Sequence, residues 1–130
     1  MHEFLSSTFF ILASKTVLTF FFWAAGIFGL FNFKEIVKEM VDVNLPQPKL
    51  FAIATIACQL ISSFVIIFNP YGYAWLGCGS LIIFTLLTIP LGHAFWKFEE
   101  PKRTSEFHIA LEHISLIGGL MLAAAISVNQ

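Results

Sequence analysis

Four long apolar runs leave this sequence few possible folds. Each is close to the ~20 residues that an α-helix needs to cross a bilayer, and none alternates as a membrane strand does. Because lipid offers the backbone no hydrogen-bond partners, such runs predict membrane-spanning helices. The predicted spans are residues 8–30, 50–68, 72–96 and 107–128. The sequence therefore predicts an all-α membrane protein of one domain, an antiparallel four-transmembrane-helix bundle over residues 1–130.

The composition agrees with a bilayer as the main surroundings of the chain. Hydrophobic residues make up 58% of it and charged residues 12%, against roughly 25% charged residues in soluble domains. The net charge of −1, without a basic patch, argues against nucleic acid as a partner. Cys58 and Cys78 lie inside apolar runs and form neither a disulfide framework nor a zinc motif. The N-terminus lacks the positive region of a secretion signal, so the first run is expected to remain as a helix.

The connections between the runs predict the topology. Six of the seven lysines and arginines lie in the connections 31–49 and 97–106, and an excess of positive charge marks cytoplasmic loops. We therefore expect both termini outside the membrane and these two loops in the cytoplasm. The first connection also carries apolar residues at helical spacing, which predicts a short amphipathic helix at the membrane interface. Lys15, near the outer end of the first span, is expected to extend its ammonium outward to the headgroups.

The most unusual side chain is Glu112, about one and a half turns into the last span. His108 lies one turn earlier on the same helix face, and Ser115 and Gly119 continue that face. Small residues favour close helix packing in lipid, so this face is predicted to point into the bundle. His93 lies near the cytoplasmic end of the third span, where it is predicted to meet Glu112 or His108.

Three interpretations of these polar residues are open from the sequence. The first is a structural hydrogen bond that ties the third span to the fourth. The second is a proton relay, or a polar lid over a pocket for a quinone or a lipid headgroup. The third is a metal site formed by His93, His108 and Glu112, whose spacing matches no strong ligand motif. No metal and no catalytic residue is therefore assigned.

Gln59 adds a polar group at the middle of the second span, with Thr55 and Ser63 one turn to either side. The pattern is typical of hydrogen bonds between helices, and the alternative is the wall of a binding pocket. The candidate binding residues from the sequence are His93, His108, Glu112 and Gln59.

Several segments, taken in chain order, resemble the DoxX family of small bacterial membrane proteins. They are Lys15–Leu18 followed by Phe21–Gly26, then Leu30–Phe33, Asn44–Pro48, His93–Trp96 and Ser115–Leu122. The family has a basic residue, an aliphatic run and a glycine in its first helix, and a Leu-Pro turn after it. This chain differs at Gly29, where the family often has lysine, and at Glu112–His113, where it often has Lys-Asn.

The resemblance implies a four-helix protein of the inner membrane. The family is named for membrane subunits associated with thiosulfate:quinone oxidoreduction, and related four-helix proteins include receptor-assembly factors. The first function hypothesis is a non-catalytic partner or assembly factor of a membrane complex, bound to another protein or to a second copy of itself. The alternative is a quinone-linked redox accessory subunit. The third is a small carrier or lipid-binding protein.

Overall fold

The computed structural model describes residues 1–129 and is helical almost throughout. The helices are α1 (His2–Leu5), α2 (Thr8–Leu18), α3 (Phe20–Phe31), α4 (Phe33–Asp42), α5 (Pro48–Phe68), α6 (Ala74–Gly92) and α7 (Lys102–Val128), with the 3₁₀ turns η1 (Pro70–Gly72) and η2 (Phe95–Lys97). No β-strand occurs in residues 1–129. The all-α prediction is therefore confirmed.

Three of these helices, α5, α6 and α7, are long and apolar enough to cross a membrane alone. A fourth crossing requires α2 and α3 to act as one span, because the chain bends by 54° between them. The sequence predicted one continuous helix over residues 8–30, and in this respect the prediction is wrong. The structure thus contains three candidate spans, or four if the bent pair is one span.

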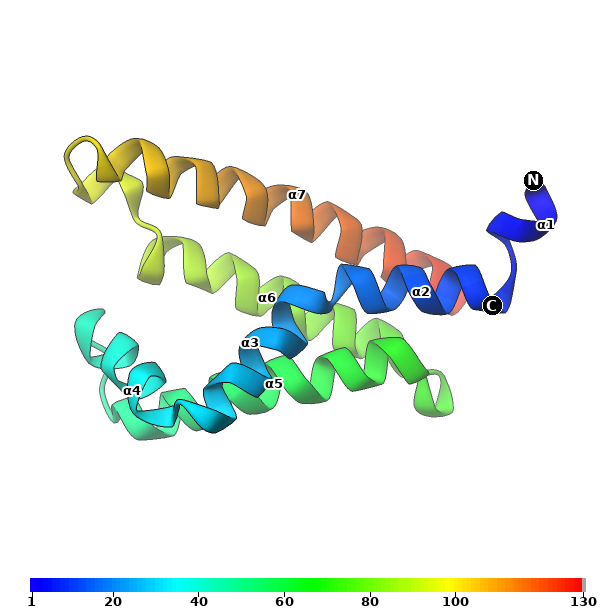
Figure 1. Cartoon of the computed structure of the whole chain (residues 1–130), viewed down its shortest axis with the longest axis horizontal. Coiled ribbons are helices and arrows are strands. Elements are labelled where there is room, and N and C mark those ends of the chain that lie inside the picture. The colour runs from blue at the N-terminus through cyan, green and yellow to red at the C-terminus, as the bar shows by residue number, and fades with distance from the viewer. Residues whose placement is uncertain (130) are drawn as a thin grey trace.

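The bend lies at Thr19, the residue between α2 and α3. Its hydroxyl donates a hydrogen bond to the Lys15 carbonyl at 2.7 Å, and a threonine bonded back to the preceding turn tends to bend a helix. The indole Nε1 of Trp23 spans the break and donates to the Thr16 carbonyl at 3.2 Å. As a result, α2 runs beside α7, whereas α3 turns away and packs against α5 (Figure 1).

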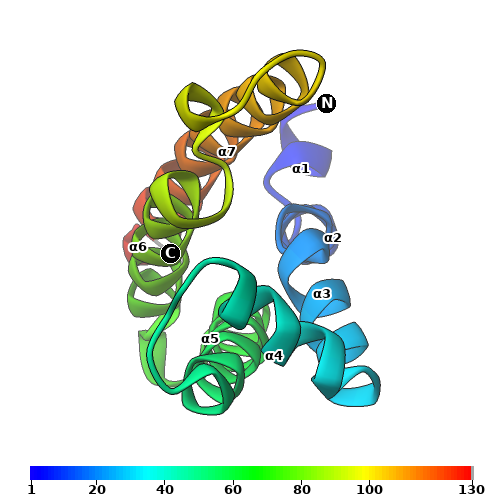
Figure 2. The same cartoon turned by 90° about the vertical axis from the view of Figure 1, so that its left-hand side faces the viewer.

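The long helices are arranged around the molecule in an order set by their contacts. Seen end-on, α5 lies between α3 and α6, and α6 lies between α5 and α7 (Figure 2). Consecutive long helices run in opposite directions (Figure 1). Both termini and η1 lie at one end of the molecule, which we call the terminal end, while α4 and the α6–α7 connection lie at the other.

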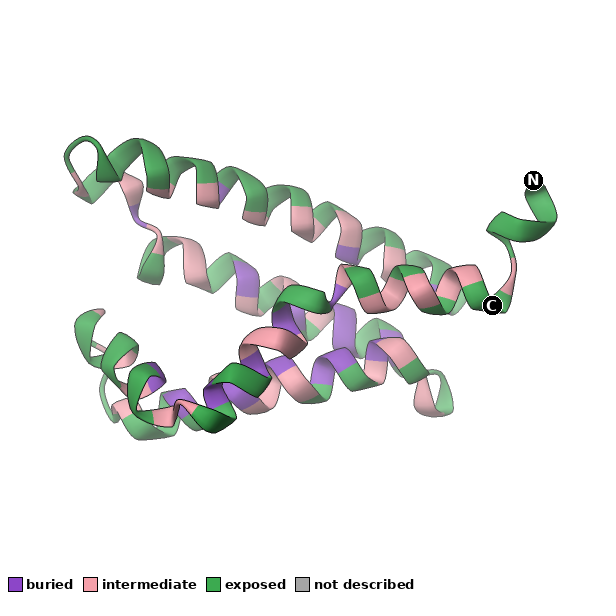
Figure 3. Cartoon of the chain, in the orientation of Figure 1, coloured by how far each residue is buried: buried purple, intermediate pink, exposed green. Residues whose placement is uncertain are grey.

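The main core forms where α3, α5, α6 and α7 converge. Gly77 lets α6 approach α5 closely, because a Cβ at this position would lie 2.9 Å from the Ser62 carbonyl oxygen. Burial is concentrated in α3, α5 and α6 (Figure 3). In the most apolar stretch of α7, 11% of residues are buried, against 33% in α5. The buried core residues are Phe22, Ile66, Cys78, Leu81 and Leu120.

The amphipathic helix predicted after the first run is confirmed as α4. Its Ile36 is buried against Ala52 and Ile56 of α5, while Lys34 and Lys38 are exposed. One apolar and one charged face is the pattern expected of a helix lying at a membrane surface.

The α6–α7 connection differs from its predicted extent at both ends. α6 ends at Gly92, two residues after Pro90, and α7 begins at Lys102 rather than near residue 107. The Glu100 carboxylate accepts hydrogen bonds from the Thr104 hydroxyl at 2.6 Å and from its backbone N–H at 2.8 Å, which satisfies a donor in the first turn of α7. These hydrogen bonds hold the pKa of Glu100 below its usual value. The longer α7 therefore includes Glu106, which the sequence had placed in a loop.

Candidate functional site

A side-chain pair at the junction of α6 and α7 joins His93 to Glu106. His93 directly follows Gly92, the last residue of α6, and its backbone N–H donates to the Thr88 and Ile89 carbonyls at 3.1 and 3.0 Å. Its imidazole Nδ1 lies 2.6 Å from Oε2 of Glu106, in the second turn of α7. The two side chains are 27% and 16% exposed, so water reaches them only in part. This pair fixes the end of α6 to the start of α7.

His113 extends the pair into a cluster. Its ring centre lies 4.9 Å from that of His93, with the rings nearly edge-to-face, and 6.2 Å from that of Phe21 on α3. Glu106 and His113 are seven residues apart, which is about two helical turns, so both face the same way. We call His93, Glu106 and His113 the His93 cluster. It brings together α7, the end of α6 and the start of α3.

The pairing predicted from the sequence is not the one observed. His93 contacts Glu106, whereas His108 and Glu112 are both exposed. The prediction that Glu112 points into the bundle is therefore wrong. Within residues 1–129, neither His108 nor Glu112 has a side-chain hydrogen bond or an ion pair.

The bend at Thr19 explains this difference. Gly119 does pack closely, because a Cβ there would lie 3.0 Å from Cδ1 of Leu18 on α2. Beyond Leu18, however, the chain turns by 54° toward α5. The same face of α7 is thus covered at Gly119 and uncovered at Ser115 and Glu112, which are exposed.

Two members of the His93 cluster, Glu106 and His113, were missed as site residues. Glu106 falls within the predicted loop 97–106, and His113 is not among the four candidate residues named from the sequence. The seven-residue spacing between them was the available signal, since two turns separate residues on one helix face. The spacing is informative only if Glu106 and His113 belong to one helix, and they do because α7 begins at Lys102.

Gln59 is buried on α5, as a polar residue inside the bundle should be, at 7% exposure. It lies against α3, because a Cβ on Gly26 would be 3.5 Å from the Gln59 Cβ. Nearby in the chain, the hydroxyl of Ser63 is buried without a hydrogen-bond partner, as is that of Thr85 on α6. No hydrogen bond in the described part of the chain connects Gln59 to the His93 cluster.

The geometry limits the chemistry that the His93 cluster can perform. A histidine hydrogen-bonded to a carboxylate can hold a proton and pass it to a neighbouring group, here the imidazole of His113. Among residues 1–129, no three His, Cys, Asp or Glu side chains are placed to hold a metal ion. The cluster is therefore a candidate for structural hydrogen bonding or for proton transfer.

These features describe a helical membrane protein with three or four spans and a polar cluster at one end of its bundle. A family model, that of DoxX, matches residues 10–94, well over half of the chain. The chain belongs to the DoxX family. No curated protein and no solved structure matches it. The matched region includes His93 and ends before α7, so Glu106, His113 and Glu112 lie outside it.

Proposed function

We propose that this DoxX-family protein is a non-catalytic partner or assembly factor of a membrane complex in the bacterial inner membrane. In this proposal α2 and α3 form one bent span, so that four antiparallel spans place both termini outside. The positively charged connections support this orientation, because α4 and the α6–α7 connection lie at the same end of the molecule (Figure 1).

One observation carries the proposal, the uncovered polar face on the N-terminal half of α7. His108, Glu112 and Ser115 are all exposed along it. Their spacing of four and three residues places them on one helix face. Because the bend at Thr19 takes α3 away toward α5, no helix within residues 1–129 covers them. We call these three residues the α7 polar face.

The depth of Glu112 makes this exposure costly in lipid. Val128 lies sixteen positions after Glu112, and at a rise of ~1.5 Å per position this is about 24 Å of helix. If the hydrocarbon core of about 30 Å ends near Val128, Glu112 lies just inside its cytoplasmic edge. A charge at mid-membrane costs ~2.5–3.5 kcal/mol, and less near the edge. A partner helix that donates hydrogen bonds to Glu112 would remove this cost.

The test places a photo-crosslinking amino acid at Ser115 in cells that express the protein at its natural level. We expect a discrete protein adduct at Ser115. One hydrogen bond between helices in lipid contributes about 0.6–1.7 kcal/mol, so Glu112→Leu should reduce the yield roughly 3- to 18-fold. The crosslinker at Ile83, which is 61% exposed on α6, is the matched control and should give no discrete protein adduct. Lipid adducts alone at both positions, or yields unaffected by Glu112→Leu, would contradict the proposal.

A second candidate, a quinone-linked redox accessory subunit, is favoured by the His93 cluster. A quinone takes up protons when it is reduced, and the hydrogen-bonded His93–Glu106 pair beside His113 is suited to supply them. Solvent extracts of the purified protein should then contain quinone, and Glu106→Gln should lower its amount several-fold. Glu112→Leu should leave it unchanged, because Glu112 lies outside the cluster. Extracts without quinone, or equal losses in both variants, would exclude this candidate.

A further inference from the structure

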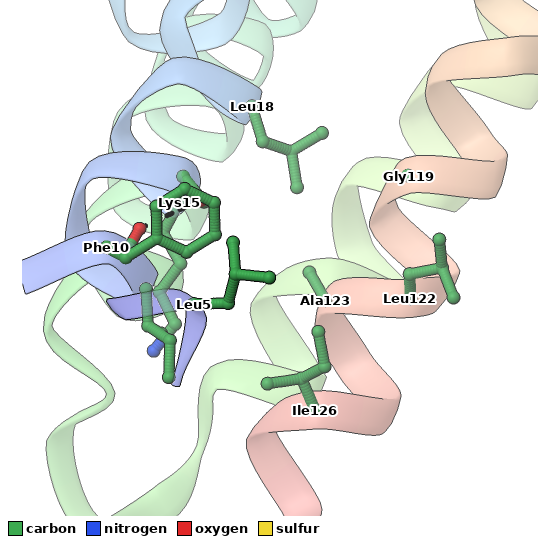
Figure 4. Close-up of a pocket in the computed structure, with 10 residues that line it drawn as sticks. Leu5, Phe10, Lys15, Leu18, Gly119, Leu122, Ala123 and Ile126 are labelled. Atoms are coloured by element: carbon green, nitrogen blue, oxygen red, sulfur yellow. Dashed lines mark hydrogen bonds between the residues drawn. The ribbon is translucent and has the colours of Figure 1, made fainter. Parts of the chain in front are cut away.

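A groove between α2 and α7 opens near the terminal end of the molecule (Figure 4). It has a volume of about 270 Å³ and is lined mainly by aliphatic side chains. Its deep end is closed where Leu18 of α2 meets Gly119 of α7, since a Cβ on Gly119 would lie 3.0 Å from Leu18. Leu5 of the short helix α1 borders it, and Ala123 and Ile126 form the wall on α7.

Lys15 is the one charged residue among those that line this groove. Its side-chain nitrogen lies on the side away from Leu18 (Figure 4). Across residues 1–129, no carboxylate lies within ion-pair distance of the ammonium, because the single ion pair found there is His93–Glu106. The neighbouring Ser14 hydroxyl already donates to the Phe10 carbonyl at 2.8 Å. The groove therefore combines a mainly apolar lining with one positive charge that has no ion-pair partner within residues 1–129.

We propose that this groove binds one acyl chain of an anionic phospholipid, whose phosphate pairs with Lys15. The volume is too small for a partner helix, which has a diameter of about 10 Å with its side chains, but it suits an extended hydrocarbon chain. The charge is positive and lies on the side away from Leu18, while the lining is otherwise mainly aliphatic, a combination that suits an anionic headgroup joined to a hydrocarbon chain. Pairing with a phosphate also compensates an ammonium that would otherwise remain unpaired near lipid.

The site does not depend on the partner proposed for the α7 polar face. The groove uses α7 from Gly119 onward, where α2 covers the helix, and the polar face ends at Ser115, where α2 no longer does. A result against one proposal therefore leaves the other standing.

The experiment measures lipid retention by native mass spectrometry after reconstitution into nanodiscs of phosphatidylglycerol mixed with phosphatidylcholine. We expect the unaltered protein to retain phosphatidylglycerol several-fold more than phosphatidylcholine. Lys15→Gln should abolish this preference, and Lys15→Arg should preserve it, because arginine also pairs with phosphate. Ala123→Phe, which fills the groove but keeps the charge, should lower retention of both lipids. Ile83→Phe, on an exposed surface of α6 outside the groove, should change neither.

The outcomes separate the possible occupants. Equal retention of the two lipids by the unaltered protein, or a preference that survives Lys15→Gln, would overturn the proposal. So would a protein dimer that excludes lipid and is disrupted by Ala123→Phe, since a second copy would then occupy the groove. If Ala123→Phe does not fold, the comparison of Lys15→Gln with Lys15→Arg still decides the matter.

Discussion

Replacing Gly77 with valine is expected to separate α5 from α6 and to destabilise the helical core. A Cβ at this position would lie 2.9 Å from the Ser62 carbonyl oxygen and 3.0 Å from Cγ1 of Ile66. The first of these atoms belongs to the backbone, so no side-chain rotation relieves the clash and the helices must move apart. Overpacking of this kind costs about 1–3 kcal/mol. Reversible unfolding in mixed detergent would measure the loss.

Gly79 offers a matched control two residues away on the same helix. A Cβ added at Gly79 meets nothing within 4 Å, so Gly79→Val carries the same change in backbone freedom and β-branching without the clash. We expect Gly79→Val to unfold close to the unaltered protein. Equal destabilisation by the two variants would show that α6 does not approach α5 as closely as the structure indicates.

Much of the fold follows from patterns that are local in the sequence. Continuous apolar runs predicted α5 and α7 because a helix in lipid needs only length and hydrophobicity. Helical spacing of apolar residues predicted α4 in the same way. The bend at Thr19 was not predictable by these means, since residues 8–30 are apolar on both sides of it. Thr19 donates its hydroxyl to the Lys15 backbone carbonyl at the bend, but Ser14 and Thr16 make the same kind of bond inside α2, so a hydroxyl residue in the sequence does not mark the bend.

The errors in the candidate site follow from that bend. Assigning Glu112 to the inner face was a reasonable inference from the small residues beside it, and Gly119 does contact α2. Whether a helix face is covered, however, depends on the path of another helix, which one sequence pattern does not determine. His93 was identified as a tie between helices, but its partner is Glu106, because α7 starts a turn earlier than the apolar run. The sequence patterns therefore predicted the individual helices but did not determine which helices contact one another.

Removing the carboxylate of Glu106 is expected to loosen the junction between α6 and α7. Hydrogen bonds to charged groups contribute about 1.5–3 kcal/mol, and partial exposure of this pair places the expected loss for Glu106→Leu near ~1–2 kcal/mol. The reason is that Glu106→Leu leaves the His93 imidazole without its acceptor at 2.6 Å. His93→Leu should cost a similar amount, and the double variant should cost little more than either single one. Unfolding in mixed detergent, read as a double-mutant cycle, measures the coupling between the two side chains.

Glu112→Leu is the control that makes this test specific. Glu106 and Glu112 lie on the same helix and differ in one respect that matters here, since Glu106 is paired with His93 and Glu112 is exposed. In the isolated protein, Glu112→Leu should leave the unfolding free energy unchanged or raise it, because it removes a carboxylate from an apolar surface. If it destabilised the isolated protein as much as Glu106→Leu does, Glu112 would have a partner within the chain. The α7 polar face would then be covered within this chain. The proposed interaction with a second membrane protein, which rests on that face being uncovered, would have no support.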